Sequence, residues 1–400
     1  MKFWVYIARR LLLMVPVLIG VVTIVFLLLN SIPVTEQLSA GCATPRSGWI
    51  PGTPAYVHCE ARLGLNAPAP VRYGLYLLHT FTLQWGFVSP NSFMAKNVPG
   101  VLACLTPCAV LTLIQAWLPY TIELAALSLI LILAMAIPLG NYSAVFRNRP
   151  LDQGTRVFSF SGYALPGYLL GAIVIIALMF ALGLSSTQSS GCTSGVYGQL
   201  VGSWSNCFGQ YYPHGAIPGF MNGMGATHPT GFPTVDALIY AATHSVPPGA
   251  PADYLWSVAA NHVLRLLLPA VVIAYGSTAS ILRFVRNSML EVMNLDFIRT
   301  ARSKGVPERR VIRYHAGRNS LNVTVTVLGL TFAFFLGGFA VIEDLFQLNG
   351  VGRLFTYAIL QPVDFGTIFA STVLFTIIIV IANVIVDVVY GYLDPRVRVG

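Results

Sequence analysis

The residues best suited to chemistry in this 400-residue chain are concentrated at residues 286–320, an arginine-rich block between two long apolar segments. Guanidinium groups recognise a partner by charge and by paired hydrogen bonds. Bond-breaking chemistry is not indicated, because no lysine stands in GxxxxGK[ST], no histidines form HExxH, and no serine or cysteine stands in a nucleophile elbow. The block therefore predicts a surface that a partner grips rather than a catalytic centre.

The block predicts two short helices joined at Gly305. In its first half, apolar residues recur at spacings of three and four and share one helical face, while Arg299 and Arg302 point elsewhere; these apolar residues are Leu290, Met293, Phe297 and Ala301. Gly305 permits a turn that a residue with a Cβ resists, and Pro307 followed by Glu308 suits the first turn of a second helix. Two helices at a fixed angle make a rigid knob.

Composition predicts an all-α protein that crosses the membrane several times. Hydrophobic residues make up 56% of the chain and charged residues only 9%, against about 25% charged residues in a soluble domain. Six apolar segments approach the length of about 20 residues that a span requires: residues 11–29, 118–139, 157–182, 263–282, 321–341 and 367–390. The run at residues 101–117 continues into the second span without a polar turn, so we interpret it as an interfacial lead-in or an extension of that helix.

Charge decides the orientation. With six spans and a cytoplasmic N-terminus, 17 of the 23 Lys and Arg residues lie on the cytoplasmic side, as the positive-inside rule expects. Both termini are then cytoplasmic in a multi-pass protein of the cell membrane. The net charge of +9 does not indicate nucleic-acid binding, because the basic residues cluster beside apolar spans instead of alternating with stacking aromatics.

All six cysteines fall in or beside two long outer segments, residues 31–100 and 185–261. Disulfides persist in oxidising compartments, so this asymmetry favours the pairs Cys42 with Cys59 and Cys192 with Cys207. Cys104 and Cys108 fit buried free thiols about as well. Nearby histidines complete no familiar ligand spacing, so no metal site is expected.

The leading polar residues inside predicted spans are Glu123, Asn383 and Asp387. A proton-coupled carrier would place acidic residues there, but such groups more often hold a helix bundle together by hydrogen bonds between helices. We therefore expect a structural role and assign none of the three as a substrate ligand.

The sequence RTARSKGVPERRVIRYHAGRN at residues 299–319 resembles the cytoplasmic loop of permease subunits of binding-protein-dependent ABC importers, in the dipeptide and oligopeptide branch. The resemblance continues in LPYTIEL around Glu123, NVIVD from Asn383 to Asp387, and the closing LDPRVR. LGLNAP at residues 63–68 resembles a segment that precedes an amphipathic helix, for which interfacial packing and a receptor-facing vestibule are both open interpretations.

Residues 341–354, here called the Glu343 loop, are similar to the family's VxExxFxxPGxGxL loop after the fifth span. Asn349 stands where the family usually has proline, which puts the loop shape in question. Glu343 is the acid of this motif, and Gly350 and Gly352 are interpreted as letting the loop fold back towards the pore. A simple turn is the alternative.

The resemblance implies a type I importer fold with six transmembrane helices and two large extracytoplasmic loops. It divides the chain into a first helix (1–30), an outer insertion (31–114), a transmembrane domain (115–392, including an outer loop at 184–261) and a cytoplasmic tail (393–400). Residues 286–320 are then the ATPase-coupling loop, whose expected contact residues are Arg299, Thr300, Ala301, Gly305, Glu308, Arg309, Val311 and His315.

The implied function is half of the pore of an ATP-driven importer for di- and oligopeptides. The implied partners are membrane lipid, a second homologous permease, an external solute-binding protein, and two ATPases that bind ATP and Mg; this chain itself is expected to bind no cofactor and to catalyse nothing. Oligosaccharide or nickel cargo is an alternative, as is an ion-coupled secondary carrier. A carrier lacks support in the absence of an inverted repeat, and a membrane scaffold would give no reason for the coupling loop.

Overall fold

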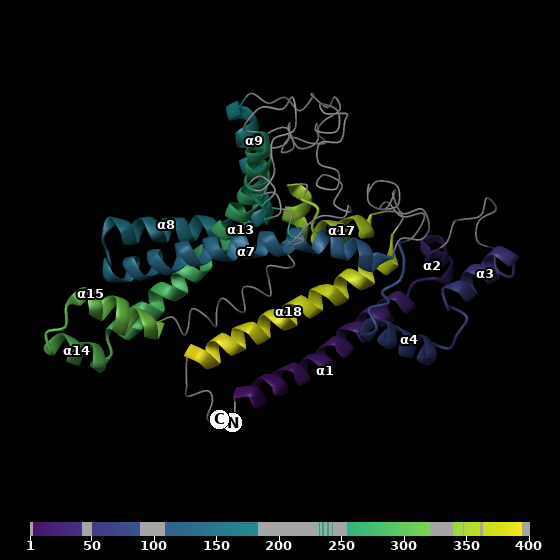
Figure 1. The fold of residues 1–400 in the computed structure, drawn as a ribbon, viewed down its shortest axis with the longest axis horizontal. Coiled ribbons are helices and arrows are strands. Elements are labelled where there is room, and N and C mark those ends of the chain that lie inside the picture. The colour runs from purple at the N-terminus through teal and green to yellow at the C-terminus, as the bar shows by residue number, and fades with distance from the viewer. Residues whose placement is uncertain are drawn as a thin grey trace.

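The computed structural model describes residues 3–41, 50–88, 109–182, 254–320, 339–346, 348–360 and 363–393, together with residues 232, 234–235, 238–239 and 242. Within these residues every regular element is a helix, and extended chain pairs in one isolated bridge, between Phe87 and Ala109. The expected all-α class is confirmed (Figure 1).

Four long helices contain four of the expected spans. They are α1 (Phe3–Asn30), α7 (Val110–Val145), α13 (Tyr254–Met293) and α18 (Phe365–Leu393). In α7, α13 and α18 the apolar stretch is long enough to cross a membrane, and α1 carries a shorter apolar stretch at Val15–Asn30. The fifth expected span, at residues 321–341, lies almost entirely outside the described residues, so the count of six stays a prediction.

The third expected span, at residues 157–182, is not one continuous helix. It is divided between α8 (Pro150–Ala164) and α9 (Gly167–Leu182), and the two helices are bent by 102° at the break. Pro166 has no N–H to donate and disfavours helical backbone at Leu165, whose φ and ψ of −103° and 122° are extended. Apolar composition predicts one continuous span here, whereas Pro166 is the local signal for the break.

The apolar run before residue 118 belongs to the second span. Helix α7 begins at Val110 and continues without a break to Val145, passing through Pro119 and Pro138. The interpretation of this run as an extension of the second helix is confirmed from Val110 onward, and residues 101–108 lie outside the described part.

The first outer segment contains three short helices, α2 (Val34–Gly41), α3 (Pro54–Arg62) and α4 (Ala69–Phe81). Helix α4 is the amphipathic helix expected after LGLNAP. The Tyr73 hydroxyl lies 2.7 Å from the Thr23 hydroxyl of α1, and the Tyr76 ring meets Phe26 of α1 and Phe369 of α18 edge to face. These contacts seat α4 on α1 and α18, which favours interfacial packing for this segment.

Three apolar clusters follow the length of the helices. The first joins α1, the start of α7, α17 (Val351–Ile359) and α18, and the second joins the middle of α7 and α13 with α9 and residues 339–348. The third joins the ends of α7 and α13 to the coupling loop. Figure 1 shows α7, α8 and α13 extending together towards the coupling loop, with α1 and α18 running side by side below them.

Candidate functional site

The coupling loop forms two short helical segments at the end of α13. Helix α14 covers Asp296–Ser303, and the second segment begins as α15 (Glu308–Arg310) and continues as a π-helical turn at Val311–Ala316. The two helices expected around Gly305 are therefore present, and the start of the second at Pro307 and Glu308 is confirmed.

Gly305 ends α14 in a Schellman turn. Its φ is +74°, in the left-handed region that L side chains rarely adopt. The Gly305 N–H donates to the Arg302 carbonyl at 3.0 Å, and the Val306 N–H donates to the Ala301 carbonyl at 3.2 Å, which is the hydrogen-bond pattern of this motif. The turn thus depends on the backbone conformation of one glycine.

An ion pair spans the same turn. Arg302 donates from Nε to one Glu308 carboxylate oxygen at 3.1 Å and from a terminal nitrogen to the other at 2.7 Å. These hydrogen bonds and the nearby positive charge hold the pKa of Glu308 below its usual value. The pair joins α14 to α15, and its position in solvent keeps its contribution to stability small.

The coupling loop is seated on an apolar pad, the third apolar cluster. Ile298, Val311 and Met289 at the end of α13 are fully buried, and Ala144 at the end of α7 is buried beside them. The pad packs α14 and the second segment against the ends of α7 and α13, and close-packed contacts of this kind resist independent movement.

One residue of the coupling loop differs from expectation. Phe297 is 41% exposed, because the helix breaks at Asn294–Leu295 and Ile298 takes the inward position. Ala301 is buried in the pad, as its place on the apolar face predicted, and Val311 is buried there as well, so a contact of either residue with the ATPase stays a prediction. Periodicity across the break assigned only Phe297 to the wrong face, since a helix restarted after a turn has a new phase.

The remaining expected contact residues lie on the surface of the loop. The exposed residues are Arg299, Thr300, Gly305, Glu308 and Arg309. His315 is half-buried, with its ring edge-to-face against the exposed Tyr314. These positions form a mostly polar surface around the Gly305 turn, opposite the apolar pad.

Glu343 is the centre of a buried hydrogen-bond network at the N-terminus of α17. Its carboxylate is fully buried and accepts hydrogen bonds from the Thr121 hydroxyl of α7 at 2.7 Å and from the Arg353 N–H at 3.1 Å. Thr121 in turn accepts from the Val351 N–H at 2.9 Å. Glu343 and Thr121 together satisfy N–H groups that the first turn of a helix leaves without partners.

Gly350 and Gly352 allow this close approach. A Cβ at Gly350 would stand 2.1 Å from the Glu343 carboxyl carbon, and one at Gly352 would stand 2.5 Å from the Ala340 Cα. The Glu343 carboxylate lies against both glycines, and the fold of this loop towards the pore stays a prediction. Asn349, which replaces the usual proline, accepts a hydrogen bond from the Arg353 guanidinium at 3.2 Å.

Glu123 binds a segment of the second outer loop. Its carboxylate is 8% exposed and accepts from the Thr234 N–H at 2.9 Å, from the Thr234 hydroxyl at 2.7 Å and from the Val235 N–H at 3.4 Å. Both partners belong to the segment 184–261. The expected hydrogen-bonding role is present, and the partners of Glu123 described above lie in the outer loop.

The other expected polar and cysteine residues are placed only in part. Asn383 is exposed on α18, and Asp387 lies one turn further along the same helix, with its side chain outside the described residues. Cys59 of α3 is disulfide-bonded, and α3 packs against α2, which ends at Gly41 beside Cys42. The pairing Cys42 with Cys59 stays a prediction, as does Cys192 with Cys207.

Asp152 is the polar residue that sequence reasoning missed. It is fully buried near the start of α8 and accepts from Arg286 of α13 at 2.8 Å, from Arg156 at 2.8 Å and from the Ser143 hydroxyl of α7 at 2.7 Å. It therefore links three helices at the start of the coupling loop. An acid following Pro150 with an arginine four residues later was a usable local signal, but Arg286 is distant in sequence.

Metal chemistry finds no support in the described part of the chain, where no group of three or more His, Cys, Asp or Glu residues is close enough to hold an ion. The buried carboxylates of Glu343, Glu123 and Asp152 accept hydrogen bonds from other groups of the protein.

Relatives with described roles match nearly the whole chain. The oligopeptide transport system permease protein AppB of Bacillus subtilis is 29% identical over 397 residues, covering 98% of this chain and 99% of the relative. The dipeptide transport system permease protein DppB of Alkalihalophilus pseudofirmus is 28% identical over 395 residues, with 98% and 99% covered. The di/tripeptide transport system permease protein DppB of Pseudomonas aeruginosa is 28% identical over 398 residues, with 98% of each covered.

Residues 136–399 match the family described as the binding-protein-dependent transport system inner membrane component. The matched region contains α8, α9, α13, the coupling loop, the Glu343 loop and α18. Since this match covers more than half of the sequence, the chain belongs to that family and is a permease subunit of a binding-protein-dependent ABC importer.

Proposed function

We propose that this chain forms half of the translocation pore of a peptide importer and that its coupling loop docks on a cytoplasmic ATPase. The observation that carries the proposal is the arrangement of the coupling loop: a polar surface around Gly305, held by the Schellman turn and the Arg302–Glu308 pair, and backed by an apolar pad on α7 and α13. A loop that must transmit force needs both an accessible face and a rigid attachment.

Peptide cargo is proposed from the relatives, whose names describe transport of dipeptides, tripeptides or oligopeptides. The chain would work with a second homologous permease, two ATPases that bind ATP and Mg, and an external solute-binding protein. In this arrangement the first helix, the outer insertion, the transmembrane domain and the tail keep the boundaries given above, and both termini are cytoplasmic.

In the proposed cycle, ATP binding closes the two ATPases and draws the coupling loops together. The pad carries this movement into α7 and α13, and the attached helices rock to open the pore outward. Hydrolysis of ATP resets the assembly. The described residues of this chain contribute positions and charges to these steps but no catalytic group.

The ion-coupled carrier has less support. A proton relay needs an acid that can exchange protons along a path, whereas the Glu123 carboxylate is occupied by the backbone and side chain of an outer segment. We therefore propose a positioning role for Glu123, in which it fixes the outer loop above the start of the pore.

Reconstitution tests the proposed function. The chain, its partner permease, the ATPases and the solute-binding protein are placed in liposomes, and uptake of a labelled dipeptide is measured with and without ATP. We expect uphill uptake only from the complete assembly with ATP. Uphill uptake by this subunit alone, driven by a proton or sodium gradient, would overturn the proposal.

A further inference from the structure

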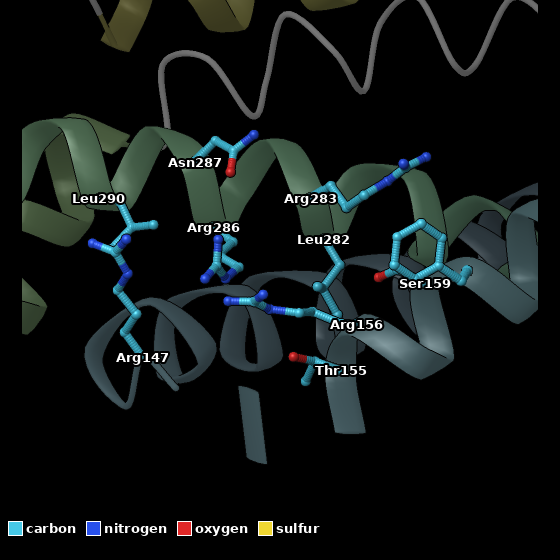
Figure 2. Close-up of a pocket in the computed structure, with 10 residues that line it drawn as sticks. Arg147, Thr155, Arg156, Ser159, Leu282, Arg283, Arg286, Asn287 and Leu290 are labelled. Atoms are coloured by element: carbon cyan, nitrogen blue, oxygen red, sulfur yellow. The ribbon is translucent and has the colours of Figure 1, made fainter. Parts of the chain in front are cut away.

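A basic cavity of about 350 Å³ opens where α7, α8 and α13 meet, at the start of the coupling loop. Figure 2 shows its residues projecting from facing helices. Four arginines, Arg147, Arg156, Arg283 and Arg286, line the cavity, along with neutral polar groups that include Ser159 and Asn287. None of the roles assigned above uses this cavity.

The cavity carries an excess of positive charge. Asp152 does not line the cavity itself but pairs with two of its arginines, Arg156 and Arg286. Arg147 and Arg283 have no carboxylate partner within the described residues, although Arg283 also covers the Tyr163 ring at 4.9 Å. One carboxylate thus stands among four guanidinium groups, which favours an anionic ligand.

A buried donor also faces this space. The Ser159 hydroxyl, in a residue only 1% exposed, lines the cavity and has no hydrogen-bond partner in the described structure. A buried hydroxyl without a partner is costly, because water no longer compensates it. A ligand oxygen in the cavity would accept its hydrogen bond.

The position of the cavity and the apolar residues beside it suit a lipid headgroup. Arg283 and Arg286 directly follow the fourth expected span, which ends at residue 282, so they lie at the level where a span leaves the hydrocarbon. Beside them α8 exposes Val157, Phe160 and Tyr163, which are 68%, 67% and 72% exposed and recur every three residues on one face. The charged cavity and the apolar face together fit a molecule with an anionic head and an apolar tail.

We propose that this cavity binds the phosphate of an anionic phospholipid in the leaflet on the side of the coupling loop, with an acyl chain along the exposed face of α8. Basic pockets between membrane helices recognise anionic headgroups by this combination of charge and depth. Free phosphate would meet the same guanidinium groups but would leave the apolar face uncovered, and that face favours the lipid. The bound headgroup would bridge α7, α8 and α13 beside the pad of the coupling loop.

Native mass spectrometry of the assembled importer in neutral detergent tests the proposal. Phosphatidylglycerol and phosphatidylcholine are the two probes, and inorganic phosphate is the competitor. We expect the wild-type complex to retain phosphatidylglycerol at least tenfold better than phosphatidylcholine, with millimolar phosphate displacing little of it. Equal retention of the two lipids, or full displacement by phosphate, overturns the lipid assignment.

The double variant Arg147→Gln/Arg283→Gln leaves the pairs of Asp152 intact and should lower the preference for phosphatidylglycerol at least tenfold. The matched control is Arg149→Gln, because Arg149 lies in the same connection between α7 and α8 as Arg147, over the Phe146 ring, but does not line the cavity. The double variant Arg147→Lys/Arg283→Lys keeps both positive charges and should retain most of the preference for phosphatidylglycerol. An unchanged preference in the Gln/Gln variant, or an equal loss in the control, contradicts the assignment.

A measurement without variants covers the case in which the double variant fails to assemble. Phosphatidylglycerol with a photoreactive group on its acyl chain is added to the wild-type complex, and the cross-linked peptides are identified. We expect labelling on α8 around Val157, Phe160 and Tyr163. Labelling confined to other helices overturns the proposal.

Discussion

Gly305 in the coupling loop and Gly350 in the Glu343 loop both stand at tight turns, but they are required for opposite physical reasons. A Cβ at Gly305 would meet nothing within 4 Å, yet the φ of +74° suits a residue without a side chain. Gly350 has a φ of −96°, which any residue adopts, yet a Cβ there would collide with the buried Glu343 carboxyl. One position is limited by backbone conformation and the other by space.

The difference separates function from folding. The Gly305 turn is exposed and makes few contacts, so a substitution there changes the angle between two short helices without disturbing the bundle. The Glu343 loop connects α7 to α17 through buried hydrogen bonds, so a substitution there disturbs the packing of long helices. We therefore expect uncoupled but folded variants from the first region and unstable variants from the second.

The largest expected effect is in the Glu343 loop. Gly350→Ala and Gly352→Ala should each destabilise the protein by about 3 kcal/mol, because neither backbone nor buried carboxylate can yield easily. The measurement is the thermal unfolding midpoint of the purified complex. Gly154→Ala in α8, where a Cβ meets nothing within 4 Å, is the matched control. A midpoint for Gly350→Ala as high as that of the control would show that space does not limit this turn.

Removal of the Thr121 hydroxyl should have the next largest effect. Thr121→Val leaves the Val351 N–H without its partner and takes one hydrogen bond from Glu343, for a loss of about 2 kcal/mol. Thr112→Val, at an exposed position near the start of the same helix, should cost much less. The two variants are compared by their free energy of unfolding in denaturant. Equal losses of stability would show that the hydrogen bonds of Thr121 contribute no more than those of an exposed threonine.

Substitution of Gly305 should separate stability from coupling. Gly305→Val should cost on the order of 1 kcal/mol through its positive φ, so the protein still assembles with its partner permease. ATP hydrolysis should no longer drive uptake, because a tilted second segment moves Glu308 and Arg309 relative to the ATPase. Gly317→Val, near the end of that segment, should impair coupling less, and its stability is measured as well because a Cβ there would stand 3.1 Å from the Ile312 carbonyl oxygen.

Asparagine sharpens this comparison, since it tolerates left-handed backbone better than other residues with a Cβ. Gly305→Asn should keep most of the coupled transport that Gly305→Val loses. Substrate-stimulated ATPase activity and peptide uptake are measured for both variants. Normal coupled transport by Gly305→Val would remove this turn from the mechanism.

The smallest expected effect is at the exposed Arg302–Glu308 pair. Glu308→Gln should cost less than about 1 kcal/mol, and the loss should shrink at high salt, because water and ions screen an exposed pair. The folded-state pKa of Glu308 is lowered, so its contribution is present above the ordinary carboxyl pKa and is lost as pH falls through the lowered value. Unfolding midpoints of both proteins should therefore converge below about pH 4. A difference that persists in acid would exclude the charge as its cause.

Local sequence patterns predicted the elements whose causes are local. The long apolar runs identified helices α1, α7, α13 and α18, because a span needs only continuous apolar residues. Gly305 and Pro307 identified the turn of the coupling loop, because glycine and proline act on their own backbone. The break at Leu165 had an equally local signal in Pro166, which apolar composition alone concealed.

Only the tertiary structure decided which groups the buried polar residues bind. Thr121 meets Glu343 across 222 positions of the chain, Asp152 meets Arg286 across 134, and Glu123 meets Thr234 across 111. A hydrogen bond between distant residues depends on how long helices pack, and no local periodicity carries that information. The sequence by itself determined a membrane permease subunit with a coupling loop, whereas packing determined which acids cap helices, which hold helices together, and where four arginines converge.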